Sequence, residues 1–477
     1  MPPHLANELL LTIFRCLDDV YDARALSHAN RPFRKLALFI PELWTTLDSR
    51  LGPSAAGVFA RRSIDQRLQV ILYHRNLEDR EFDTCRMFLD VALQYADRWT
   101  RFTVDAWLLQ VVEFATEHCA THFLGSPDGG NQLRLLEEVV LRANAQWKGR
   151  KEGYTELRCL PFTARSLILD SVHSFEPQWF PQLEILELLH LELTVADVVY
   201  LVQAAPLLRR LLVGEFASPE PDTRAPAFPS IILDHLQALE LRRTSDSQIP
   251  EWFRHVRMIN LRQLNLTIAA TAPDDLAFAL SMIDHNYPIE LLTIKFMRHT
   301  PKPTDLLTRR RRKKVNPNPA PPFGRLLAFP RLVALRLEGT QLKDVDITLL
   351  VELPQLESLA LLFEDLLSPI GLQHLVDARL HDPAVCALRE LTVMWCQLLP
   401  TTVAGNFSAR VPHVKWMSGD EEQDGQSDAD EYIADTDDQE SETDNEDDVS
   451  DDVSLIALRQ EARLVGRGFR VMQHLPI

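Results

Sequence analysis

The sequence predicts an α/β protein in which a small unit of three helices precedes a curved, irregular solenoid of strand–helix units. Three observations carry this prediction. A leucine motif recurs at intervals that fit one strand and one helix, and helix-compatible stretches fill those intervals. A third observation is that the chain opens with short amphipathic segments that are not part of the repeat. A highly acidic segment near the C-terminus lacks the apolar residues of a core and is expected to be disordered.

The leucine motif is clearest in four copies that follow the pattern P-x-L-x-x-L-x-[LV]. These copies read FPQLEILEL, APLLRRLLV, FPRLVALRL and LPQLESLAL. Weaker copies share only the L-x-x-L-x-L core, as in LQALEL, LRQLNL, IELLTI and LRELTV. Counted at the fourth core position from Leu186, successive copies lie 25, 28, 25, 28, 43, 24 and 32 residues apart. The longest interval contains a proline-rich basic stretch, residues 299–323, which we interpret as an insertion.

The stretches between the leucine copies are compatible with helices. They include TVADVVYLVQAA, APDDLAFALSMIDH, LKDVDITLLVEL and PIGLQHLVDARLHD. Each unit is therefore expected to be a short strand, a turn and a helix, with the first, fourth and sixth core positions facing inward. One unit cannot bury its apolar edge alone, but stacked units bury a continuous leucine core. A generic α/β domain with several similar strands is the alternative.

This pattern resembles the leucine-rich repeat family over roughly residues 95 to 400. That family usually places Asn or Cys after the strand, where the side chain bonds the backbone of the turn. Here only Cys396 fits, and the equivalent positions hold residues such as Thr340 and Glu364. The resemblance therefore implies an irregular member of the family with poorly regular turns.

The first helix is expected within LANELLLTIFRCLDD, where apolar residues fall at helical spacing on one broad face: Leu5, Leu9, Leu10, Ile13, Phe14 and Leu17. A second short segment and RPFRKLALFIPELW follow, with a proline early in the third helix and a break at the next proline. Three helices in roughly 45 residues make a small core. Such a unit has more apolar surface than it can bury, so we expect it to complete its packing against another chain.

These residues resemble the F-box family, whose members tend to read Leu-Pro-x-Glu-x-Leu-x-x-Ile-Phe-x-x-Leu, followed by Val-Cys-Arg-x-Phe-Arg-x-Leu and Leu-Trp. The departures are Ala6, Ala29 and Asn30, which stand where the family has proline, valine and cysteine. An F-box followed by leucine-rich repeats resembles fungal F-box proteins in particular. The resemblance implies that the following residues contact a Skp-type adaptor: Leu5, Leu10, Ile13, Phe14, Leu17, Leu26, Phe33, Leu36 and Trp44.

The same resemblance implies a substrate-recognition subunit of a Skp–cullin–F-box ubiquitin ligase. The adaptor would link the chain to a cullin, and the repeats would present an unknown protein substrate for ubiquitination. Such a chain is not an enzyme and needs no cofactor. From the spacing of the repeats, the candidate substrate surface consists of the central outward strand residues: Glu187, Leu212, Glu240, Asn265, Thr293, Arg336, Ala360 and Thr392.

The net charge of −18 comes from one segment. Between Asp420 and Asp452 there are 18 acidic residues and no lysine or arginine, and the rest of the chain has 50 of each sign. The alternative function is therefore a repeat scaffold outside any ligase, whose acidic segment binds a basic partner such as histones. A basic run of six consecutive cations is a candidate nuclear-import signal: Arg309, Arg310, Arg311, Arg312, Lys313 and Lys314. No interleaved aromatic residue supports nucleic-acid binding there.

Other function classes find little support in the sequence. Neither a secretory signal nor a membrane span is expected, and six scattered cysteines without a C-x-x-C pair favour a cytoplasmic or nuclear location. No phosphate-binding loop, dinucleotide fingerprint, zinc-protease or hydrolase motif is present. The stretch EHCATH, with His118, Cys119 and His122, is the sole foothold for a metal enzyme, and we interpret it as structural.

The sequence is divided as follows: an F-box-like unit over 1–48, a connecting segment over 49–94, repeats over 95–417, the acidic segment over 418–454 and a C-terminal segment over 455–477.

Overall fold

The computed structural model has two compact units, residues 1–421 and 422–477. The helices and strands given below all belong to the first unit. The residues that the structure describes are 7–15, 17, 20–74, 79–124, 133–143, 164–172, 180–191, 193–216, 230–244, 248–268, 280–281, 283, 286–297, 322–364 and 366–417.

The chain begins with three short helices and a single-turn 3-10 helix. They are α1 (Asn7–Arg15), α2 (Val20–Ala29), α3 (Arg31–Leu38) and η1 (Pro41–Trp44). The Asn30 side chain caps α3 by accepting a hydrogen bond from the Phe33 N–H at 2.8 Å. Pro32 lies in the first turn of α3, where its missing N–H costs nothing. We call α1, α2, α3 and η1 together the N-terminal helical unit.

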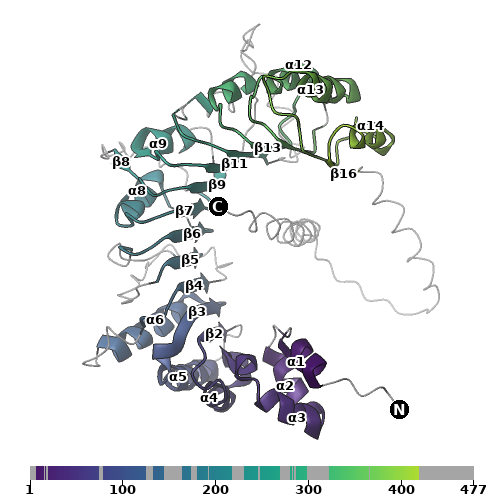
Figure 1. The fold of residues 1–477 in the computed structure, drawn as a ribbon. Coiled ribbons are helices and arrows are strands. Elements are labelled where there is room, and N and C mark those ends of the chain that lie inside the picture. The colour runs from purple at the N-terminus through teal and green to yellow at the C-terminus, as the bar shows by residue number, and fades with distance from the viewer. Residues whose placement is uncertain are drawn as a thin grey trace, which may run out of the picture. The chain divides into compact units, whose positions relative to one another are not determined.

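The main feature is one parallel sheet whose 14 described strands follow each other in chain order (Figure 1). Its strands are β1 (Thr46–Asp48), β2 (Leu68–His74), β3 (Trp99–Ala106), β4 (Glu138–Ala143), β5 (Ser166–Asp170), β6 (Ile185–Leu189), β7 (Arg210–Val213), β9 (Ala238–Thr244), β11 (Gln263–Ile268), β12 (Leu291–Phe296), β13 (Ala334–Glu338), β14 (Ser358–Leu362), β15 (Glu390–Met394) and β16 (His413–Met417). A separate pair joins β8 (Ile231–Ile232) to β10 (Val256–Arg257). This is the solenoid-like arrangement of strand–helix units that the repeat predicts.

The helices between the strands lie on one side of the sheet (Figure 1). They are α4 (Pro53–Arg62), α5 (Asp79–Leu93), α6 (Leu109–Leu124), α8 (Val195–Gln203), α9 (Gln248–His255), α12 (Asp344–Leu350), α13 (Pro369–His381) and α14 (Ala404–Ser408). Short 3-10 turns accompany them: η2 (Ser49–Leu51), η3 (Ala96–Arg98), η6 (Pro322–Ala328) and η7 (Thr401–Val403). Of the four helical stretches expected from sequence, three correspond to α8, α12 and α13, and most of APDDLAFALSMIDH lies outside the described residues.

The register of the sheet follows the leucine repeat. Leu186 pairs with Leu211, which pairs with Leu239, and so on through the leucine at the fourth core position of every later copy. These leucines are at most 1% exposed and face the helices. Because side chains alternate along a strand, the residues on either side of each leucine face away from the helices. We call this second surface the open face.

The turns that leave the strands are more regular than the sequence suggested. The same left-handed backbone conformation occurs after β5, β6, β14 and β15, at Ser171, His190, Phe363 and Trp395, all with φ between 49° and 58°. This conformation is costly for residues other than glycine, so tertiary contacts must hold each turn. In one such place the fully buried Glu364 carboxylate accepts hydrogen bonds from the N–H groups of Thr340 and Leu342, each at 2.8 Å.

Glu364 thus bonds the backbone of a neighbouring turn, which is the task that Asn or Cys performs in the resembled family. Its own N–H lies 3.4 Å from the Cys396 sulfur, so Cys396 links the next turn. Glu364 can take this place because a carboxylate accepts the same N–H bonds as an amide oxygen.

A buried arginine organises the chain around α12 and α13. Arg379 is 1% exposed, and burial lowers the pKa of its guanidinium. Its two terminal nitrogens donate, at 2.6–3.2 Å, to five carbonyl oxygens, those of Leu350, Val351, Leu353, Leu356 and Cys386. These carbonyls belong to the end of α12 and to the loops that lead into β14 and β15. One side chain therefore supplies the donors that this buried backbone needs.

Replacing Arg379 by methionine is expected to destabilise the chain by more than about 3 kcal/mol, since each buried carbonyl left without a donor costs about 1–3 kcal/mol. The measurement is urea unfolding followed by circular dichroism. The matched control is Arg389→Met, because Arg389 is mostly exposed and pairs with Glu357 at 3.3 Å. The control is expected to cost less than about 1 kcal/mol. Equal losses for the two variants would contradict the role given to Arg379.

Candidate functional site

The residues of the N-terminal helical unit that the F-box resemblance singles out have different environments. Phe14 and Trp44 are buried, at 2% and 0% exposure. The Phe14 ring packs edge-to-face on Phe33, and the Trp44 indole N–H donates to the Ala37 carbonyl at 3.0 Å. Leu10, Leu17, Leu26, Phe33 and Leu36 are half-buried against the same core, Ile13 is exposed, and Leu5 lies outside the described residues. Phe14 and Trp44 thus hold the unit together, and the half-buried and exposed side chains form its surface.

Large apolar side chains remain exposed on this unit. Leu9 and Ile13 of α1 are 54% and 49% exposed, and Leu38 and Phe39 at the end of α3 are 41% and 82% exposed. Leu9, Leu38 and Phe39 were not among the residues chosen from sequence. Leu9 was detectable, because it stands one helical turn before Ile13 and shares its face. Exposed apolar residues gathered on one small unit are typical of a protein-binding surface.

The open face of the sheet carries the candidate substrate residues in one unbroken row. Register pairs each of them with the next on the neighbouring strand, from β6 to β15, in the order Glu187, Leu212, Glu240, Asn265, Thr293, Arg336, Ala360 and Thr392. The sequence therefore located this row correctly. That the row binds a substrate stays a prediction. Leu212 is 2% exposed, so it contributes little to the surface that a partner could touch.

The charges on the open face are largely paired. Glu187 lies 3.4 Å from Arg210, and Glu240 lies 2.6 Å from Arg242. Farther along, Glu338 is 2.6 Å from Lys295 and 3.3 Å from Arg336. The face is consequently neither an acidic nor a basic stripe, and its alternation of ion pairs with small side chains suits a protein surface of mixed character better than a polyanion.

The carboxyl ends of the strands form another row of side chains. His190 follows β6, and its Nδ1 lies 2.8 Å from an Asp170 carboxylate oxygen at the end of β5. This hydrogen bond raises the pKa of the His190 imidazole, while partial burial opposes the shift. At the far end of the same row the rings of Phe363 and Trp395 stack, with centroids 4.9 Å apart.

The EHCATH stretch lies in α6, where its three candidate metal ligands do not converge. His118 approaches Asp90 at 2.8 Å and stacks on Phe114, whereas Cys119 is buried in the core. Burial raises the pKa of the Cys119 thiol to about 12, which disfavours the thiolate that a metal would need. The residues that the structure describes contain no group of three or more histidine, cysteine or carboxylate side chains able to hold a metal ion.

Two charged segments from the sequence fall outside the described residues. These are the basic run 309–314 and the acidic segment 418–454, so the nuclear-import and histone-binding hypotheses stay predictions. Every helix in the described part of the chain is too short or too polar to span a bilayer.

The contact between His190 and Asp170 predicts a pH dependence. Because the folded-state pKa of His190 is raised above 6.5, the contact stabilises the fold below that pH, and its contribution is lost as the pH rises through the folded-state value. The measurement is an NMR titration of the imidazoles. Asp170→Asn is expected to lower the pKa of His190 and to leave the titrations of distant histidines in place. An unchanged pKa in this variant would rule out Asp170 as the cause.

No protein-family model matches the chain, and no curated protein matches it in sequence. Among solved structures, the chain is similar to one described as the crystal structure of the Rad7 and Elc1 complex in yeast. The two chains are 13% identical, the match covers 86% of this chain and 87% of that one, and the TM-score is 0.39.

Proposed function

We propose that this protein is a substrate receptor of a Skp–cullin–F-box ubiquitin ligase and carries out no chemistry itself. In this proposal the N-terminal helical unit binds a Skp-type adaptor, which joins the chain to a cullin. The open face of the sheet binds a protein substrate. The receptor acts by raising the effective concentration of substrate lysines near the charged ubiquitin carrier.

The observation that carries the proposal is the exposed apolar surface of the N-terminal helical unit. This unit is small and has more apolar surface than its own core can bury. Ile13 and Phe39 leave about half or more of their side chains in water. Burying such side chains against a partner is favourable by about 25 cal/mol per Å² of apolar area. Together with the F-box resemblance of the same helices, this surface favours an obligate protein contact at the N-terminal end of the sheet.

The second support is the construction of the open face. The helices pack on the opposite side, so the row from Glu187 to Thr392 has no helix over it among the described residues (Figure 1). Parallel strands place equivalent side chains at a regular spacing of about 4.8 Å, which creates a long, rigid surface. Repeat proteins commonly use such an extended surface for binding.

The adaptor contact is tested by the double variant Ile13→Asp plus Phe39→Asp. Two carboxylates in an apolar interface would remain unpaired, so we expect retention of a Skp-type adaptor on the tagged chain to fall at least about tenfold. The measurement is co-purification with quantitative mass spectrometry. Ile370→Asp is the matched control, because Ile370 is a 79% exposed apolar residue on α13. If the wild-type chain retains no Skp-type adaptor, the proposal fails.

The substrate contact is tested by the double variant Asn265→Arg plus Thr293→Arg, which places two bulky cations side by side in the middle of the row. We expect proximity labelling of the proteins that accumulate under proteasome inhibition to fall about tenfold, with adaptor retention unchanged. Tyr200→Arg is the control, since Tyr200 is 63% exposed on α8. A labelling pattern insensitive to the row variant but altered by the α8 variant would move the substrate site to the helical side.

A further inference from the structure

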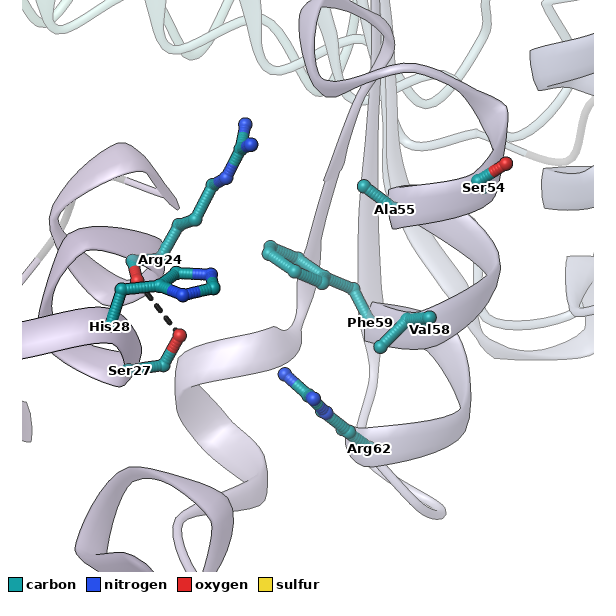
Figure 2. A pocket seen from close by; sticks show the side chains of 8 residues that line it. All are labelled: Arg24, Ser27, His28, Ser54, Ala55, Val58, Phe59 and Arg62. Atoms are coloured by element: carbon teal, nitrogen blue, oxygen red, sulfur yellow. Dashed lines mark hydrogen bonds between the residues drawn. The ribbon is translucent and has the colours of Figure 1, made fainter. Parts of the chain in front are cut away.

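A hollow of about 260 Å³ opens between the N-terminal helical unit and the first helix that follows it. Figure 2 shows its two walls facing each other. One wall consists of Arg24, Ser27 and His28 of α2, and the other of Val58, Phe59 and Arg62 of α4. This hollow contains none of the residues that the proposed function uses.

The hollow is lined by two arginines and a histidine that have no acidic partner among the described residues. None of the carboxylates in the described part of the chain forms an ion pair with Arg24, His28 or Arg62. The guanidinium of Arg62 lies over the Trp44 ring at 4.7 Å. Burial, and then the neighbouring charge of Arg34, lower the pKa of Arg62.

Arg62 is not needed to cap its own helix. The Arg98 guanidinium already donates to the carbonyl of Ala60 at 3.1 Å and to that of Gln66 at 2.7 Å. The Ala60 carbonyl in the last turn of α4, and the Gln66 carbonyl beyond the helix, therefore have a donor from another part of the chain. Arg62 remains available for an external anion, and such an anion would offset the repulsion between Arg62 and Arg34.

The size and lining of the hollow define the chemistry of its ligand. Its volume is below the roughly 300–1,000 Å³ of sites that enclose a small molecule or cofactor, so it accommodates only one or two side chains. Val58 is a half-buried apolar side chain of its lining, and in Figure 2 the ends of Arg24 and Arg62 lie on either side of the neighbouring Phe59 ring. An apolar side chain flanked by carboxylates is complementary to this arrangement.

We propose that this hollow binds an acidic segment of a partner protein, with an apolar side chain on Val58 and flanking carboxylates on Arg24 and Arg62. A polypeptide fits better than a nucleic acid, because Phe59 is only 4% exposed and offers no free ring face on which a base could stack. The inference rests on the charge and shape of the hollow, so it is independent of the adaptor and substrate contacts proposed above.

The test is a binding titration of the full chain with a fluorescently labelled peptide, Gly-Glu-Asp-Leu-Glu-Asp-Gly. Its neutral counterpart, Gly-Gln-Asn-Leu-Gln-Asn-Gly, is the probe control. We expect the acidic peptide to bind and the neutral one not to bind. Affinity should fall as salt is raised from about 0.05 to about 0.5 M, since the charges are near the surface.

Arg24→Gln and Arg62→Gln are each expected to lower the affinity for the acidic peptide about tenfold. This is the usual scale for losing one charge-assisted contact. Arg61→Gln is the matched control, because Arg61 precedes Arg62 on α4 but does not line the hollow. Arg62→Lys should retain most of the affinity through its charge. Because Arg24 is not part of the Arg62–Trp44 contact, Arg24→Gln tests the hollow without disturbing that contact. Thermal unfolding of each variant verifies that it folds.

Three results would overturn the proposal. The first is that the acidic peptide does not bind to the wild-type chain. The second is that Arg61→Gln weakens it as much as Arg24→Gln and Arg62→Gln. The third is that a single-stranded oligonucleotide binds as tightly as the peptide and loses affinity in the same two variants, which would assign the hollow to nucleic acid.

Discussion

The constraint on which the structure depends is that no strand–helix unit can bury its leucines alone. Each unit contributes a short strand whose inward residues need a neighbour on either side, and parallel register supplies both. Leu186, Leu211 and their equivalents are therefore buried in one continuous layer between sheet and helices. This layer also forces the intervening strand residues onto the open face.

The two ends of this stack show how the fold closes its edges. At the N-terminal edge, β1 is only three residues long, and the N-terminal helical unit precedes it directly. At the other edge, Trp416 of β16 stacks on Phe407 of α14, while the other side chains of β16 are exposed or half-buried. A short edge strand such as β1 resists pairing with other chains. The exposed apolar side chains of the N-terminal unit are thus a separate feature that edge protection does not explain, and this is why we assign them to a partner.

Buried polar groups hold the irregular parts of the repeat in place. Arg379 satisfies carbonyl groups around α12 and α13, and Glu364 satisfies N–H groups of the neighbouring turn. Neither residue belongs to the leucine motif. Their roles arise because an irregular turn leaves backbone groups unpaired away from water, and any side chain with the right donors or acceptors can meet that need. The left-handed turn at Phe363 immediately precedes Glu364 in the chain.

The sequence by itself determined the strand–helix repeat, the residues of its core and the central row of the open face, because leucine spacing fixes which side chains face inward and alternation fixes the rest. It also located three helices before the sheet. It did not locate β16, whose sequence lacks the leucine motif. Only the tertiary structure decided that Phe14 and Trp44 are buried while Leu9 and Phe39 are exposed, and that Arg24 and Arg62 share a hollow. Exposure depends on how separate helices pack, and spacing along one helix does not specify that packing.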